Sequence, residues 1–375
     1  MDRTRETDIR RTSNIQYPVC VPLHGVTFEK KITRKEYGRW LSVKFVRTKN
    51  IIPGMVTARS ICNESGNLLL AANHTITNTN IRQIRALEYA GIYIYDKYSD
   101  YEFFDEIITQ QERVQAATAL KTIDIDKVIY YTNKIVNEML GRDELLLDLQ
   151  DMRSHHDATY NHCINVSLYA TACGIGLGMQ QKELQDLATA AMLHDIGKTM
   201  IDTSILDKPG KLTDEERAII NKHPQIGYDM LYGNPGISAA TRAGVLLHHE
   251  NEDGSGYPKG LSGNEIPLIA KIIHVADVYD ALCSKRAYKD DYQASESIEF
   301  LMSHCGTMFD LHVVETFLKY LVLYPVGCDV ELSDGRIARV IKNRAESVQR
   351  PIVITNHETI DMLKVLNITI IREID

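Results

Sequence analysis

The spacing of apolar residues changes along the chain and divides it into segments of different kinds. Residues 42–100 alternate short strand-like and helical runs, which predicts a small α/β module. Residues 101–145 have the 3.6-residue period of linker helices, and residues 146–322 are helical almost throughout. Residues 323–375 return to short runs with a period of two, which predicts a β-rich appendage. We therefore expect a mainly α protein, in which a helical bundle is preceded by the module and followed by the appendage.

The small module shows the local signals of a hairpin and a helix. Residues 55–61 alternate as one strand, and residues 68–71 follow a turn as its hairpin partner. Asn78 or Asn80 is expected to cap a helix that ends at Gly91. No cluster of catalytic residue types stands out here, so we interpret residues 42–100 as a regulatory module.

Charge is distributed unevenly. The 375 residues have a formal net charge of -8, which disfavours a nucleic-acid polymer as the partner. Residues 1–49 nevertheless hold 12 Lys or Arg against 5 Asp or Glu, and residues 1–41 show no clean period. We interpret residues 1–41 as a weakly ordered basic extension. An acidic body that binds an anion needs a local source of positive charge.

Cysteine use and hydropathy indicate the compartment. The seven cysteines are odd in number, scattered and without a C-x-x-C pair, which predicts free thiols in a cytoplasmic protein. No run of about 18 apolar residues occurs, so no membrane span is expected.

Histidines and aspartates gather in the helical segment. Asp277 stands on an apolar helix face, where a carboxylate needs a partner. His223 follows a capping box and is expected to end its helix at Pro224. The side chains at helix ends or on core-facing positions are His162, His194, Asp195, His223, His248, His249 and Asp277. This placement is typical of side chains that converge on metal inside a helical bundle.

Six motifs follow in order along this segment: HDIGK at 194–198, HP at 223–224, HHE at 248–250, DGSGYP at 253–258, ADVYDAL at 276–282 and SKRAYK at 284–289. Together they resemble the HD-GYP domain, a subfamily of HD phosphohydrolases similar to cyclic di-GMP phosphodiesterases. The resemblance covers roughly residues 130–322 and implies an HD-GYP catalytic domain within residues 146–322.

The resemblance implies a metal centre. It places the metal ligands on His162, His194, Asp195, His223, His248, His249 and Asp277, with Asp195 as a catalytic bridging ligand. Members with a third metal carry Glu four residues before the first His, where this chain has Ala158, so we expect two divalent ions. Five imidazoles and two carboxylates suit iron or manganese, with nickel or zinc as alternatives. The ions would outweigh the two carboxylates and leave the pocket positive.

Basic and loop residues near these motifs are candidates for substrate contact. Lys198, Arg286 and Lys289 match the motifs and can bind phosphate, and Lys198 is also a catalytic candidate. The loop after the histidine pair offers close backbone approach, an aromatic face and a hydroxyl, through Gly256, Tyr257 and Pro258.

The leading interpretation is a metal-dependent phosphodiesterase of bacterial second-messenger signalling. It would hydrolyse cyclic di-GMP to pGpG, and further to GMP, with a water acidified by both ions attacking phosphorus in line. Hydrolysis of cyclic GMP-AMP shares every metal ligand and stays open as an alternative. A non-catalytic signalling adaptor is a third hypothesis. A homodimer and signalling partner proteins are compatible with the sequence.

Overall fold

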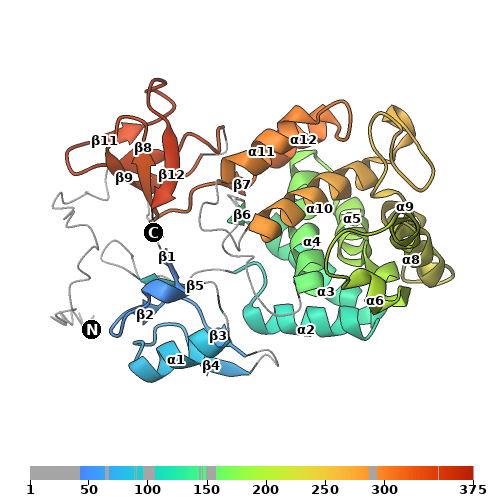
Figure 1. Cartoon of the computed structure of the whole chain (residues 1–375), viewed down its shortest axis with the longest axis horizontal. Helices are drawn as coiled ribbons and strands as arrows, with labels where there is room; N and C mark the ends of the chain where they lie inside the picture. The colour runs from blue at the N-terminus through green and yellow to red at the C-terminus, as the bar shows by residue number, and fades with distance from the viewer. Residues whose placement is uncertain are drawn as a thin grey trace, which may run out of the picture.

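The chain is mainly α-helical with smaller β parts, as the sequence predicts (Figure 1). The computed structural model describes residues 43–63, 67–87, 89, 91–95, 106–142, 145, 147–148, 158–286, 294–344 and 346–374. The predicted extension at residues 1–41 and the phosphate contact Lys289 lie outside these residues. Arg286 ends a described helix, but its side chain is outside the description.

The N-terminal module packs two small sheets with one helix. Its sheets have the order β1-β5-β2 and β3-β4, from β1 (Val43–Arg47), β2 (Val56–Thr57), β3 (Ile61–Cys62), β4 (Leu68–Leu70) and β5 (Gly91–Tyr95). The pairing of β3 with β4 confirms the predicted hairpin, while residues 64–66 of its predicted turn lie outside the described residues. The prediction of one strand over residues 55–61 is wrong, because β2 pairs with β5 while β3 pairs with β4.

Helix α1 (Asn78–Ala86) also begins differently from the prediction. The N-cap is Thr77, whose hydroxyl accepts from the Asn80 amide, while the Asn80 side chain accepts from the Thr77 amide. Asn80 is therefore the third helical residue of a capping box. Ile81 and Ile84 are the buried face of this helix.

The predicted linker helices are α2 (Gln110–Lys121) and α3 (Ile125–Leu140). Thr109 and Glu112 form a capping box at the start of α2, and Asp124 caps α3. Both helices pack against the central helices of the bundle, α2 on α4 (Ala158–Gly176) and α3 on α5 (Gln181–Leu193) (Figure 1).

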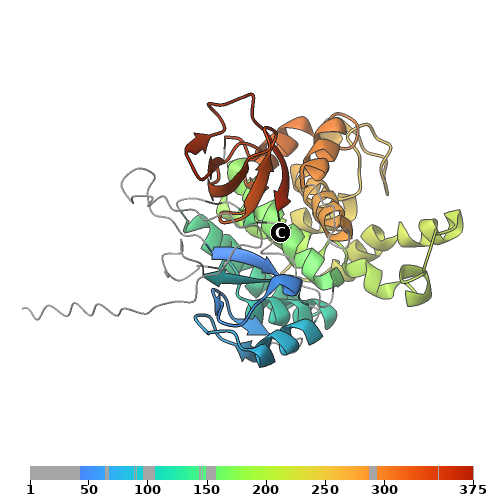
Figure 2. The same cartoon turned by 60° about the vertical axis from the view of Figure 1, so that its left-hand side comes forward.

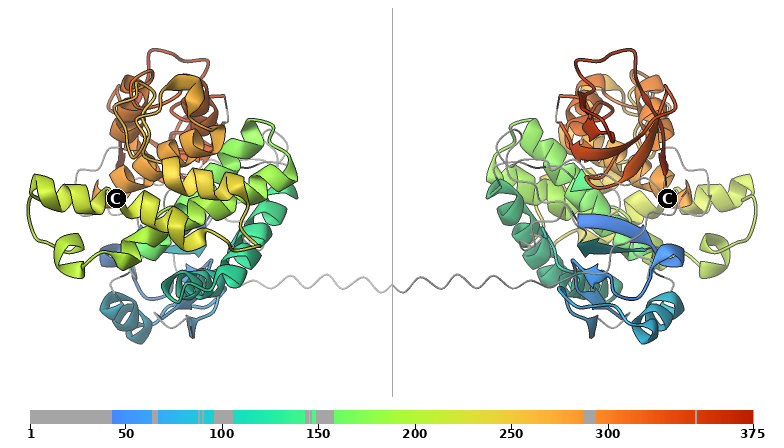
Figure 3. Two further views of the ribbon diagram at one scale, coloured as in Figure 1. Left: turned by 90° about the vertical axis from the view of Figure 1, so that its right-hand side faces the viewer. Right: turned by 90° about the vertical axis from the view of Figure 1, so that its left-hand side faces the viewer.

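The helical core is built around α4, α5, α9 (Ala239–Leu247) and α10 (Leu268–Arg286). Helix α10 contacts the other three, and α5 contacts both α4 and α9. Tyr169, Tyr279 and Phe317 lie at its centre, with ring centroids 5.2–5.8 Å apart. The short helices around α7 project from one side of this body (Figures 2 and 3). The elements are α4 (Ala158–Gly176), α5 (Gln181–Leu193), η3 (Ile196–Met200), α6 (Thr203–Leu206), α7 (Asp214–Ile220), α8 (His223–Leu231), α9 (Ala239–Leu247), η4 (Gly263–Glu265), α10 (Leu268–Arg286), α11 (Ala294–Ser303) and α12 (Leu311–Leu318).

The C-terminal appendage is an antiparallel sheet, as predicted. Its order is β11-β10-β9-β8-β12, from β8 (Asp329–Leu332), β9 (Ile337–Lys342), β10 (Ile352–Ile354), β11 (Thr359–Asp361) and β12 (Ile370–Ile374). Lys44 of the module lies 3.6 Å from Asp329 of the appendage. The module and the appendage therefore meet at one end of the helical body (Figure 1).

A short parallel pair joins the two ends of the helical core. It consists of β6 (Leu147–Asp148) and β7 (Leu321–Val322), and the Leu147 amide also donates to the Tyr320 carbonyl at 2.7 Å. The chain thus enters and leaves the core at the same place.

Candidate metal centre

The first group of converging side chains is His162, His194 and Asp277, whose ligand atoms all lie within 4.8 Å of one another. His162 comes from the first turns of α4, His194 ends α5, and Asp277 stands on α10. The Asp277 Oδ1 atom lies 3.0 Å from His162 Nε2 and 3.8 Å from His194 Nε2. Helices far apart in sequence thus bring three potential metal-ligand atoms close together.

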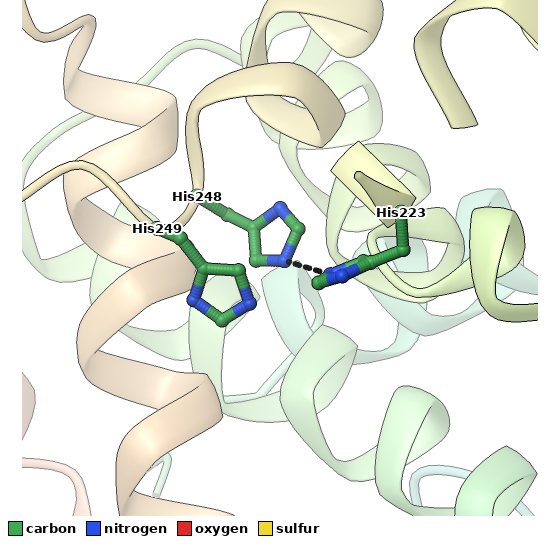
Figure 4. A group of neighbouring side chains, drawn as sticks. All are labelled: His223, His248 and His249. Atoms are coloured by element: carbon green, nitrogen blue, oxygen red, sulfur yellow. Dashed lines mark hydrogen bonds between the residues drawn. The ribbon is translucent and has the colours of Figure 1, made fainter. Parts of the chain in front are cut away.

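The second group is His223, His248 and His249 (Figure 4). His248 and His249 follow the end of α9, and their rings lie side by side facing His223. The prediction that Pro224 stops the preceding helix is wrong. That helix, α7, already ends at Ile220, while His223 is the first residue of α8 and Pro224 occupies its opening turn. Proline is well tolerated there because its missing N–H would be unpaired anyway.

Asp195 lies between the two groups. Its Oδ2 atom is 3.4 Å from His194 Nε2, and its Oδ1 atom is 3.3 Å from His223 Nε2. One carboxylate therefore faces both groups with different oxygens. The structure brings together all seven side chains that the sequence singles out.

Hydrogen bonds on the outer nitrogens set the tautomers of three histidines. Their Nδ1 atoms lie 2.7–2.8 Å from the carbonyl three residues earlier, in the pairs His194 with Ala191, His223 with Ile220 and His248 with Val245. A carbonyl only accepts, so each Nδ1 carries the hydrogen and each Nε2 presents a lone pair to the site. His194 Nε2 and Asp195 Oδ1 are buried and have no hydrogen-bond partner among the described residues. Such inward-facing acceptors fit a cation.

The protonation states of the metal-free site agree with this arrangement. Burial lowers the pKa of His248 and His249, the latter to about 3, so both rings are neutral. Although burial alone would raise the pKa of Asp195, the Lys198 ammonium beside it holds that pKa well below its usual value. Neutral imidazoles and ionised carboxylates are the forms that bind metal.

His162 is the exception among the described histidines of the site. Burial would lower its pKa, but hydrogen bonds with Asp277 and Asp280 raise it to about 10. A proton therefore sits on His162 Nε2 beside Asp277 in the metal-free protein, where a cation would replace it.

Lys198 lies on the bridging carboxylate. Its Nζ atom is 2.6 Å from Asp195 Oδ2, and its side chain is 31% exposed. Although burial would lower its pKa, the charge of Asp195 raises it. The predicted phosphate contact thus sits at the centre of the site and supplies positive charge to it.

The loop after the histidine pair covers the second group. The Tyr257 ring stacks on His249 with centroids 4.8 Å apart, and the Tyr257 amide donates to the His249 carbonyl. A Cβ at Gly256 would lie 2.3 Å from the Asn251 nitrogen and 2.5 Å from the His249 oxygen. The close approach predicted at Gly256 is therefore to the backbone of its own loop. Pro258 continues this turn.

Several functional neighbours were missed by the sequence reasoning. The buried Glu250 carboxylate accepts from the Lys259 and Leu261 amides at 2.7 and 2.9 Å and so fixes the loop. His274 donates its Nδ1 proton to the His248 carbonyl at 2.7 Å. Glu250 belongs to the HHE motif, and His274 stands one turn before Asp277, which are the signals that could have found them.

Comparison with known proteins identifies the helical core. The HD domain family model matches residues 143–313. The helical core is thus similar to the HD domain family over residues 143–313. The predicted resemblance to HD phosphohydrolases is confirmed over this region.

Three curated relatives illustrate this family. A cyclic di-GMP phosphodiesterase of Pseudomonas aeruginosa is 36% identical over 231 residues, which are 62% of this chain and 56% of that protein. The cyclic di-GMP phosphodiesterase response regulator RpfG of Xanthomonas campestris is 44% identical over 144 residues, 38% of each chain. The 3'3'-cGAMP-specific phosphodiesterase 2 of Vibrio cholerae is 38% identical over 160 residues, 42% of this chain and 31% of that protein.

The chain spans between about a third and somewhat over half of the lengths of these relatives, from 31% to 56%. Within the part of the chain that the structure describes, no helix is both long enough and apolar enough to cross a bilayer.

Proposed function

We propose that the protein is a metal-dependent phosphodiesterase that hydrolyses cyclic di-GMP to pGpG and further to GMP. The position of Asp195, with one oxygen toward each histidine group, carries the proposal. The names of the relatives from Pseudomonas and Xanthomonas support the choice of substrate.

The donor set supports two divalent ions. His162, His194 and Asp277 would hold one ion, His223, His248 and His249 the other, and Asp195 would bridge them. Five imidazoles with two carboxylates favour iron or manganese over magnesium, with nickel or zinc as alternatives. Ala158 lies at the start of α4 and offers no ligand for a third ion.

Bound ions would supply an acidified water and offset the negative charge that develops on the phosphate. The Nε2 lone pairs of His194, His223 and His248 are held in place, because the Nδ1 atom of each ring donates to a backbone carbonyl. Lys198 offers its ammonium to a phosphate oxygen from beside Asp195. We assign Arg286 and Lys289 to the phosphates as well, and the loop of Gly256, Tyr257 and Pro258 to the substrate side of His249.

The flanking segments complete the proposal. We assign residues 42–100 to regulation, residues 101–145 to the linker, residues 146–322 to catalysis and residues 323–375 to packing or assembly, which includes a homodimer. The described cysteines form no disulfide with one another, which supports a reducing compartment such as the cytoplasm.

Hydrolysis of cyclic GMP-AMP is the second candidate, because a relative from Vibrio cholerae is named for that substrate. Both reactions use the same ligands, so only substrate contacts distinguish them. A non-catalytic adaptor is disfavoured by the presence of all seven side chains.

The test is a substrate comparison. The full chain is loaded anaerobically with Mn²⁺ or Fe²⁺ and incubated with either cyclic dinucleotide, and the products are separated by chromatography. We expect pGpG from cyclic di-GMP at a higher kcat/KM than any product from cyclic GMP-AMP. A reversed preference would favour the second candidate, and a loaded protein that cleaves neither would overturn the proposal.

A further inference from the structure

A line of buried hydrogen bonds runs from the linker helix α2 to His162. Arg113 on α2 donates from a guanidinium nitrogen to Asn165 Oδ1 at 3.0 Å. Asn165 donates from Nδ2 to Asp280 Oδ1 at 3.0 Å, and Asp280 Oδ2 lies 2.7 Å from His162 Nδ1. Arg113, Asn165 and Asp280 are 6%, 4% and 3% exposed. The residues span more than 160 positions of sequence.

The chemistry of the two ends fixes the direction of every bond in this line. A guanidinium only donates, so Asn165 must turn its oxygen to Arg113 and its amide nitrogen to Asp280. A carboxylate only accepts, so His162 must donate its Nδ1 proton to Asp280. The other ring nitrogen, Nε2, is thereby aimed at Asp277. Arg113 thus supports the same orientation of Asn165 that Asp280 requires.

We propose that Arg113 is a positioning residue for the metal centre, acting through Asn165 and Asp280 on His162. The inference rests on the proposed function, since it assumes that His162 binds metal. A carboxylate that accepts from the outer nitrogen of a ligand histidine fixes the ring and raises its basicity, and loss of such a partner typically weakens metal binding about 10- to 100-fold. Here the carboxylate is itself held by Asn165 and Arg113.

The line begins outside the region that the family model matches. Arg113 precedes residue 143, where that match starts, so the metal site draws one of its supports from the linker. The segment just before α2 is in turn held to the N-terminal module, because Arg59 Nε lies 3.1 Å from Glu106. The Arg59 guanidinium also stacks 4.2 Å above the Tyr93 ring of β5. If the module shifts α2, the position of the His162 ring would therefore change as well.

The test compares Arg113→Met with a matched variant of the same helix. Gln115→Met also removes one side-chain hydrogen bond of α2, from the Tyr131 hydroxyl, but has no path to His162. Mn²⁺ binding is measured by titration calorimetry on the full chain. We expect one of the two sites to weaken about 10- to 100-fold in Arg113→Met and both to stay intact in Gln115→Met. Equal affinities in the two variants would overturn the proposal.

A second readout is independent of metal. In metal-free protein labelled with ¹⁵N-histidine, the His162 Nδ1 proton is expected to exchange slowly because Asp280 holds it; the His162→Gln variant assigns its signal. We expect fast exchange in Arg113→Met and slow exchange in Gln115→Met, and slow exchange in both would contradict the inference. A wild-type chain that binds no Mn²⁺ would refute the proposed function, while the exchange comparison would still decide the role of Arg113.

A second variant of the same line covers the case in which Arg113→Met does not fold. Asn165→Asp keeps an acceptor for Arg113 but removes the donor to Asp280 and places two carboxylates face to face. We expect the same fast exchange and weakened site, and unchanged values would overturn the proposal.

Discussion

The Nε2 atoms of His223 and His248 lie 3.3 Å apart, although both rings have already placed their protons on Nδ1. No hydrogen is left between them, so two lone pairs face each other in a buried site. Two nitrogens bound to one ion at about 2.0–2.1 Å would lie at a similar separation. The close contact is therefore unfavourable in the metal-free protein and favourable around a cation.

Removal of metal is expected to destabilise the protein. Addition of Mn²⁺ at about 100 times its Kd should stabilise the chelator-treated chain by about 2.7 kcal/mol, because only the folded state assembles the donors. Thermal unfolding, followed by circular dichroism, should shift upward by several degrees. His248→Ala should lose most of this shift, whereas His312→Ala, a change at an exposed histidine on α12, should keep it. An unchanged midpoint in the wild-type protein would argue against a metal centre.

Replacement of the bridging carboxylate is expected to abolish turnover. Asp195→Asn keeps the size of the side chain but removes the charge that faces both histidine groups and Lys198. We expect kcat to fall about 10³-fold or more, with the circular dichroism spectrum unchanged. Activity within tenfold of wild type would show that Asp195 is dispensable.

A methyl group at Gly256 is expected to displace the loop that covers His249. Its Cβ would lie 2.3 Å from the Asn251 nitrogen, so the backbone must move. We expect a loss of about 1–3 kcal/mol in the free energy of unfolding and a lower kcat/KM. Gly141→Ala is the control, because its Cβ would be 3.5 Å from the nearest atom. Equal behaviour of both variants in denaturant titration would contradict this role.

Acid is expected to remove one contribution to stability at Lys271. This partly buried ammonium lies 2.9 Å from both Glu252 and Asp310. Although burial would raise the pKa of Asp310, the hydrogen bond from Lys271 lowers it. A carboxyl whose pKa is lower in the folded state stabilises the fold at any pH above its unfolded-state pKa, which is about 3.9 for Asp. That stabilisation is lost as the pH falls through the folded-state pKa.

Lys271→Met should therefore cost about 1–3 kcal/mol at pH 7, and the difference from wild type should shrink below about pH 4. Urea titrations at pH 7 and pH 3 measure it. Lys182→Met, which removes an exposed pair with Asp186, should cost less than about 1 kcal/mol. A constant difference between wild type and Lys271→Met at both values would rule out Asp310 as its partner.

Local signals predicted the elements and the converging side chains, because helix ends and apolar helix faces can be recognised from capping residues and from the spacing of apolar residues. His194, Asp195 and His248 stand where α5 and α9 end, and the structure brings them together. The predicted strand over residues 55–61 was wrong because alternation cannot show that β2 and β3 pair with different strands. Strand β11 was missed because Ile360 is its one apolar residue.

Contacts between distant segments could not be predicted. Gly197 reads locally as a helix stop, yet a Cβ there would lie 2.0 Å from the His223 carbonyl oxygen, so it permits η3 to pack on α8. Arg113 reads as one more charge on a linker helix, and its buried partner is 52 positions away. Such roles depend on tertiary packing and leave no periodic signal.

The pairing of β6 with β7 has a consequence for how this chain can be altered. Because Leu147 and Leu321 are paired, the segment between them begins and ends at the same place, the β6-β7 pair. A foreign sensor or reporter domain could be inserted at the β6-β7 pair without changing the path of any helix. The segment could thus be transferred as one unit, provided that the transferred piece includes α2 and Arg113.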